Sequence, residues 1–100
     1  ELPIILVGDF NASAKMNKTY DILVDDGGFE DTLVTAKESI NADWNTINGF
    51  RETRKGSRRI DWVLSKGGVK TLKAEIVLFE NSKQYPSDHQ PVSATIVLEK

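Results

Sequence analysis

Three short segments hold most of the side chains that could do chemistry. They are Gly8-Asp9-Phe10-Asn11, Arg59-Ile60-Asp61-Trp62 and Ser87-Asp88-His89. Each lies at the end of a predicted strand or in a predicted loop. Carboxylates at such places are costly to bury without partners, so we expect them to face a shared polar site or water. Hard oxygen ligands of this kind suit Mg²⁺ or Mn²⁺.

The first segment offers two polar side chains that follow a strand. Asp9 and Asn11 are two residues apart, so in an extended segment both side chains project to one side. One can polarise a water while the other donates a hydrogen bond to a phosphoryl oxygen. The alternative is an Asx-turn after a buried strand, in which both residues only cap the backbone.

The other two segments pair acids with an imidazole. Asp88 and His89 are adjacent, and Asp61 could hold the imidazole in one tautomer and stabilise its charged form. The alternative for Asp61 is a salt bridge with Arg58 or Arg59. Ser87, His89 and Asp61 also supply the residue types of a serine-hydrolase triad, but Gly-x-Ser-x-Gly is absent around Ser87, which disfavours that class.

The first half of the chain predicts one strand and one helix. Pro3 to Val7 is a continuous apolar run that ends at Gly8, which favours a strand covered on both faces. The apolar spacing from Met16 to Val24 predicts a helix that is ended by Gly27 and Gly28. The pattern over residues 29–45 is weak, so we expect mostly irregular chain there with one helical turn.

The second half predicts mainly strands. The β-rich runs at 46–50, 59–65 and 69–79 are separated by charged or glycine-containing segments. Residues 85–90 predict a polar loop, and the alternation over 91–98 predicts a final strand.

Composition fits one soluble globular unit, with 39% apolar and 28% charged residues and no apolar run near the roughly 20 residues of a membrane span. The absence of cysteine excludes disulfides and thiolate metal sites but leaves the compartment open. The net charge of -2 does not indicate a basic nucleic-acid binder.

Five basic residues lie close together in the sequence and form either a basic patch or a solvated loop: Arg51, Arg54, Lys55, Arg58 and Arg59. The chain begins with Glu1 rather than Met, so we expect it to be part of a longer protein.

Together, these segments resemble the endonuclease/exonuclease/phosphatase superfamily. Gly8-Asp9-Phe10-Asn11 is similar to its Gly-Asp-Phe-Asn signature, and Arg59-Ile60-Asp61-Trp62 to its Arg-Ile-Asp-aromatic segment. Residues 87–92, Ser-Asp-His-Gln-Pro-Val, are similar to its ending, and Thr46-Ile47-Asn48-Gly49-Phe50 resembles a stretch of its bacterial members. The resemblance spans nearly the whole chain.

The resemblance implies an α+β fold (an α/β sandwich). Residues 1–100 would form the C-terminal half of a four-layer α-β-β-α sandwich, a mostly antiparallel sheet with one or two helices outside. The N-terminal half, which carries the family's principal glutamate metal ligand, has no counterpart here. We therefore expect the missing half to be a partner and the isolated chain to be inactive.

The resemblance also implies roles for individual residues. Asp9 would orient or deprotonate the attacking water, and Asn11 would bind the phosphoryl group. His89 would contact the reacting phosphate and be oriented by Asp61, while Asp9, Asn11 and Asp88 would contact Mg²⁺ or, alternatively, Mn²⁺. The substrate would be a phosphate ester in nucleic acid, a phospholipid head group or a small molecule. The alternative function is a noncatalytic binding or structural module on the same fold.

Overall fold

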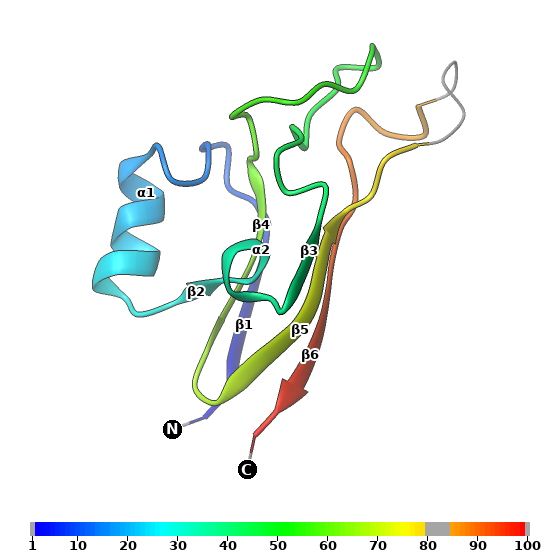
Figure 1. The fold of residues 1–100 in the computed structure, drawn as a ribbon. Helices are drawn as coiled ribbons and strands as arrows, with labels where there is room; N and C mark the ends of the chain where they lie inside the picture. The colour runs from blue at the N-terminus through cyan, green and yellow to red at the C-terminus, as the bar shows by residue number, and fades with distance from the viewer. Residues whose placement is uncertain (1, 80–84, 100) are drawn as a thin grey trace.

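The structure is a computed structural model that describes residues 2–79 and 85–99 of the chain. Its strands are β1 (Ile4–Asp9), β2 (Glu30–Asp31), β3 (Glu38–Ile40), β4 (Asp61–Lys66), β5 (Val69–Ile76) and β6 (Val92–Leu98). Its helical segments are α1 (Lys18–Asp21), the π-helical η1 (Ile22–Asp26) and α2 (Thr32–Thr35). The predicted α+β class is confirmed (Figure 1).

The strands form two three-stranded sheets, in the orders β1-β4-β2 and β3-β5-β6. All pairs are antiparallel except β3 with β5. In the first sheet Asp9 lies directly opposite Asp61, at the edge where both strands meet their loops. Figure 1 shows the loops around these strand ends and before β6 at the end of the molecule opposite the two termini. The topology thus brings all three polar segments to one end.

The first hydrophobic core lies between the β1-β4 face and the segment α1-η1. Trp62 and Leu64 of β4 are almost fully buried, with exposures of 1% and 0%. The ring of Phe10 stacks on Trp62 with centroids 4.4 Å apart, and Tyr20 meets the same indole edge to face at 5.3 Å. This aromatic cluster fixes the chain immediately after β1 against β4.

The second core lies between β5, β6 and α2. Ala74 and Ile76 of β5 are fully buried, and Leu33 of α2 packs on them. Asp31 caps α2, because its side chain accepts a hydrogen bond from the Leu33 amide at 3.2 Å. Within the described ranges 2–79 and 85–99, no helix has the length and apolar character needed to cross a membrane.

The predicted strand over residues 46–50 is wrong. That segment forms only one isolated bridge, between Ile47 and His89. Asn48 accepts from the Phe50 amide at 2.7 Å, and the Arg51 amide donates to the Asn48 carbonyl at 3.0 Å. These bonds close a turn with Phe50 at a φ of 60°, which a strand does not allow. Local side-chain capping therefore overrides the β-rich composition.

The prediction that β1 is covered on both faces is also wrong for this chain. Ile5 and Val7, which share a face with Asp9, are 40% and 60% exposed. The opposite face packs through Leu6 on the first core.

The structure also differs from the prediction at the start of the helix and within residues 29–45. The helix starts after Asn17, whose side chain accepts from the Thr19 amide at 2.8 Å, so Met16 lies outside it. Its predicted end at Gly27 agrees with the structure, and the predicted helical turn within residues 29–45 corresponds to α2. The short strands β2 and β3 in that stretch were not predicted.

Candidate active site

Asp9, Asp61 and His89 meet at the loop end of the first sheet. One ligand atom from each of the three side chains lies within 4.8 Å of the others. Asp9 ends β1 and Asp61 begins β4, so their register places both side chains on one face of the sheet. His89 reaches them from the loop before β6, which the bridge to Ile47 holds in place. Long-range strand pairing therefore assembles residues that lie far apart in the sequence.

The imidazole of His89 is oriented by Asp61. Nδ1 of His89 lies 2.8 Å from Oδ2 of Asp61. Because a carboxylate can only accept, Nδ1 carries the proton and donates it to Asp61. The other ring nitrogen, Nε2, faces Asp9 with 3.8 Å to its Oδ2, which is too long for a hydrogen bond.

The surroundings of His89 favour its charged form. The hydrogen bond to Asp61 raises the pKa of His89, and partial burial opposes this rise. The negative charges of Asp61, Asp88 and Asp9 raise that pKa further. The side chain of His89 is 27% exposed, so the imidazole is accessible to a ligand. It can therefore offer a cationic donor to an anion.

Asp9 serves the backbone and the site at the same time. Its Oδ1 accepts a hydrogen bond from the Asn11 amide at 2.8 Å, which is the Asx-turn of the alternative interpretation. Its Oδ2 faces His89, and the side chain is 41% exposed. Asn11 has a φ of 51°, a conformation that asparagine tolerates better than most residues. The turn thus fixes one oxygen of Asp9 and leaves the other available.

The carboxylate of Asp88 lies outside this cluster, whereas Asn11 adjoins it through the hydrogen bond from its amide to Asp9. The set of converging ligand atoms in the described residues comprises Asp9, Asp61 and His89. Asp88 contributes its backbone, because its carbonyl accepts from the Asn48 amide at 2.7 Å and from the Gly49 amide at 3.3 Å. Its charge is close enough to raise the pKa of His89.

Thr46 is a buried residue of the site whose individual role sequence reasoning missed. Its Oγ1 accepts from the amides of Ile60 at 2.9 Å and Asp61 at 3.2 Å, and the residue has no solvent exposure. Its carbonyl accepts from the Gln90 amide at 2.8 Å. Thr46 therefore connects the start of β4 to the loop that carries His89.

Asn48 and Gln90 complete this connection. The Asn48 side-chain amide donates to the Ser87 carbonyl at 3.1 Å and to Oε1 of Gln90. Gln90, which is 2% exposed, donates in turn to the Val77 carbonyl at 3.1 Å. The family-like stretch at 46–50 was the signal that pointed to these residues. Its β-rich composition suggested a strand rather than a support for the His89 loop.

The alternative partners proposed for Asp61 and His89 are not used. Arg59 pairs with Asp31, its NH1 lying 3.2 Å from Oδ1, and both side chains are buried. Ser87 accepts from the backbone amide of His89 at 3.1 Å rather than from the imidazole. Among the described residues, Asp61 forms no salt bridge with Arg58 or Arg59, and the arrangement does not support a serine-hydrolase triad.

A cavity of about 290 Å³ opens beside the two carboxylates. Asp9 and Asp61 line it together with apolar residues of β1, β4 and the start of β6. The polar part of its lining comes from Asp9, Asp61 and Gln90, so a small ligand placed there would meet both carboxylates.

Solved structures share this fold over nearly the whole chain. A mannosyl-6-phosphatase from Bacteroides thetaiotaomicron matches with a TM-score of 0.81 and 25% identity, over 97% of this chain and 38% of that one. A second endonuclease/exonuclease/phosphatase family protein from that organism matches with a TM-score of 0.82 and 26% identity, over 98% and 38%. A Bacteroides vulgatus endonuclease/exonuclease/phosphatase gives 0.77 and 26%, over 97% and 37%. The chain spans less than two fifths of each structure.

No curated protein matches the chain. The model of the Endonuclease/Exonuclease/phosphatase family matches residues 1–89. That match includes all three polar segments and the converging Asp9, Asp61 and His89. The chain belongs to the Endonuclease/Exonuclease/phosphatase family.

Proposed function

We propose that the full-length protein hydrolyses phosphate esters in a Mg²⁺-dependent reaction in which water attacks phosphorus in line. The convergence of Asp9, Asp61 and His89 within 4.8 Å carries this proposal, since it joins a proton acceptor to an oriented cationic donor. Family membership supports phosphoester chemistry in general. The relative named a mannosyl-6-phosphatase supports a small phosphomonoester as one candidate substrate.

Each residue has a role that fits its surroundings. Asp9 accepts the proton of the attacking water through its available Oδ2. His89 donates from Nε2 to the phosphoryl oxygens, and Asp61 keeps the proton of the imidazole on Nδ1. Asn11 binds the phosphoryl group from the adjacent turn. Positioning and charge neutralisation of this kind are the main requirements of phosphoryl transfer.

The donor atoms at the site fit a hard divalent cation. Carboxylate oxygens are the ligands that Mg²⁺ prefers, and it keeps several waters when only one or two carboxylates bind it. Asp9 would hold the ion together with Asn11 and Asp88, and the carboxylate of Asp88, which lies outside the converging set, would have to turn toward it. Mn²⁺ could replace Mg²⁺. When bound, the ion would neutralise negative charge on the phosphoryl oxygens.

We also propose that a further segment of the full-length protein completes the site. The chain spans 38% of the first matching structures, and the face that carries Asp9 also exposes Ile5 and Val7. A segment packed there would shield this apolar surface and supply more metal ligands. The isolated chain should therefore show no Mg²⁺-dependent turnover above background.

The test is hydrolysis of p-nitrophenyl phosphate and bis-p-nitrophenyl phosphate by the full-length protein, with Mg²⁺ and with EDTA. Asp9→Asn should lower kcat by about 10²- to 10⁴-fold, because a positioned general base contributes that much. The control is Asp43→Asn, the same change in an exposed ion pair with Lys55, 3.5 Å apart.

An Asp9→Asn protein that keeps nearly full activity would assign Asp9 to turn capping alone. Turnover that persists in EDTA would contradict the proposed dependence on Mg²⁺. Binding of the phosphate ester without any turnover would favour the noncatalytic module.

A further inference from the structure

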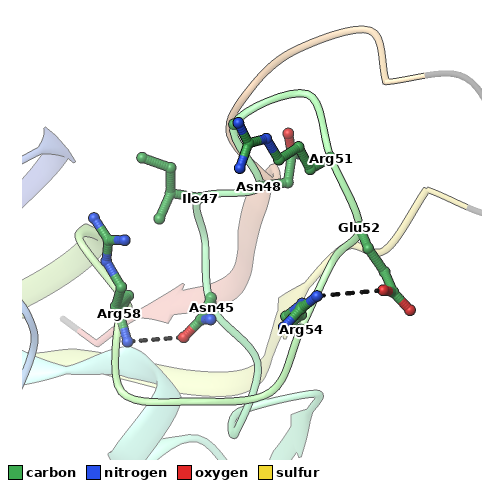
Figure 2. Close-up of a pocket in the computed structure, with 8 residues that line it drawn as sticks. Asn45, Ile47, Asn48, Arg51, Glu52, Arg54 and Arg58 are labelled. Atoms are coloured by element: carbon green, nitrogen blue, oxygen red, sulfur yellow. Dashed lines mark hydrogen bonds and ion pairs between the residues drawn. The ribbon is translucent and has the colours of Figure 1, made fainter.

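A polar groove of about 540 Å³ lies next to the candidate active site. It is lined by residues 45–58 of the loop before β4: Asn45, Ile47, Asn48, Gly49, Arg51, Glu52, Arg54 and Arg58. Figure 2 shows the side chains of Arg51 and Arg58 on either side of Ile47 and that of Arg54 turned toward Glu52. The groove is therefore rich in guanidinium groups, although the whole chain has a net charge of -2.

The charge of the groove is not neutralised by its own acid. Glu52 pairs with Arg54 at 3.7 Å, and both side chains are more than 70% exposed. Among the described residues, Arg51 and Arg58 form no ion pair with Asp or Glu. Three arginines against one glutamate leave an excess of positive charge. Two guanidinium forks thus remain available for an anion.

The groove is joined to the loop that carries His89. Ile47 is the bridge partner of His89, and antiparallel partners have Cα atoms about 4.5–5.5 Å apart. The amides of Asn48 and Gly49 both donate to the Asp88 carbonyl. Ile47 therefore both pairs with His89 and lines the groove.

The base of the groove is also held in place. Asn45 Oδ1 accepts from the Arg58 amide at 2.8 Å, and the Asn45 amide donates to the Arg54 carbonyl at 2.9 Å. The backbone at Arg54 and Arg58 is therefore held by one asparagine, and the Arg51 amide donates separately to the Asn48 carbonyl at 3.0 Å. Only the outer parts of the side chains need to be ordered by a ligand, which lowers the entropic cost of binding.

We propose that Arg51 and Arg58 bind a second phosphate group of a small substrate whose reacting phosphate lies at His89. This assignment rests on the proposed phosphoesterase function. Guanidinium groups bind phosphate through paired charge-assisted hydrogen bonds. A volume of about 540 Å³ suits a small molecule, and the net charge of -2 disfavours a long polyanion.

The test compares fructose 1,6-bisphosphate with fructose 6-phosphate by isothermal titration. We would use the full-length protein carrying Asp9→Asn, with Mg²⁺ and at fixed ionic strength. Hydrogen bonds to charged groups contribute enough for the bisphosphate to bind about tenfold more tightly or better. The double variant Arg51→Gln/Arg58→Gln should abolish this preference.

The matched control is Lys70→Gln/Lys73→Gln, which removes the same charge from exposed positions of β5. It should keep the preference for the bisphosphate. Equal binding of the two sugars, or a preference that survives in the arginine variant, would overturn the assignment. A 12-nucleotide single strand that binds more tightly than the bisphosphate through the two arginines would also overturn it.

The outcome is separate from that of the proposed function. The titration measures binding to a variant chosen for slow turnover, whereas hydrolysis of p-nitrophenyl phosphate by the wild-type protein tests the reaction. A wild-type protein that hydrolyses this ester but binds both sugars equally would retain the function and lose the second phosphate site.

Discussion

Arg59 and Asp61 are two positions apart, yet each forms an ion pair in a different cluster. The two clusters differ chiefly in burial. Arg59 pairs with Asp31 where the side chains are 8% and 1% exposed. Asp61 pairs with His89 where they are 19% and 27% exposed. Arg59 precedes β4 and faces the helices, whereas Asp61 begins the strand and faces the site.

The difference shows what burial does to a charged pair. In the buried cluster every acceptor oxygen of Asp31 is used, since Tyr20 and the Leu33 amide also donate to it. Burial raises the pKa of Tyr20 strongly, and the charge of Asp31 and its hydrogen bond add to this, so the phenol stays protonated. In the open cluster Nε2 of His89 and Oδ2 of Asp9 remain available. Polar groups whose hydrogen-bonding positions are all occupied hold the chain in place, whereas His89 and Asp9 each keep an atom that can bind a ligand.

The largest expected effect on stability comes from breaking the buried cluster. Asp31→Asn keeps the shape but removes the countercharge of Arg59, and breaking a buried pair costs about 3–5 kcal/mol. Urea unfolding of the full-length protein measures this loss. Asp43→Asn, in the exposed pair with Lys55, should cost about 1 kcal/mol or less. Equal costs at the two positions would contradict the comparison.

A smaller effect is expected at Thr46, whose hydroxyl holds the backbone of Asp61 in the partly exposed cluster of Asp9, Asp61 and His89. Thr46→Val keeps the size but leaves the buried amides of Ile60 and Asp61 without an acceptor, at about 1–3 kcal/mol. Thr46→Ser keeps the hydroxyl and should recover most of that loss in the same unfolding assay. If the valine and serine variants unfold alike, the hydroxyl does not hold the start of β4.

The smallest effect is the pH dependence of the open cluster. The pKa of His89 is raised in the folded protein, so its protonated form stabilises the fold. That contribution is complete below the ordinary histidine value of 6.5 and is lost as the pH rises through the higher folded pKa. The partly exposed pair should contribute less than about 1 kcal/mol.

NMR titration of the His89 ring in metal-free buffer measures this shift directly. Asp61→Asn removes the largest cause of the rise and should lower the pKa of His89. A titration midpoint that does not move would show that Asp61 does not set the proton affinity of the imidazole.

The sequence predicted the elements with strong local signals. The apolar run at Ile4, the glycine stop at Gly27 and the alternation of β6 depend on periodicity and backbone conformation, which neighbouring residues determine. The strand predicted at 46–50 failed because Asn48 caps the Phe50 amide, a contact that composition does not reveal. The short strands β2 and β3 are defined by their pairing with β4 and β5, and the paired residues are 33 to 35 positions apart along the chain.

The site was predicted in part. Asp9, Asp61 and His89 were selected by residue type and by resemblance, and the structure brings them together. Sequence reasoning could not assign Arg59 to Asp31, because residue 31 lies in a stretch with no clear pattern. It also could not separate Asp88 from the converging atoms, since the direction of a loop side chain depends on tertiary contacts. Local patterns identify the reactive groups, whereas their partners depend on the tertiary fold.

The register between β1 and β4 has a consequence for how the chain avoids misfolding. Asp9 lies opposite Asp61, and Gly8 lies opposite Trp62. A slip of one residue would turn every side chain of a strand to the other face and carry a carboxylate into the aromatic core. Burying an unpaired charge there is strongly unfavourable, so the slipped pairing would be rejected during folding. Asp9 and Asp61, the two acids proposed for catalysis, therefore also favour the correct register between β1 and β4.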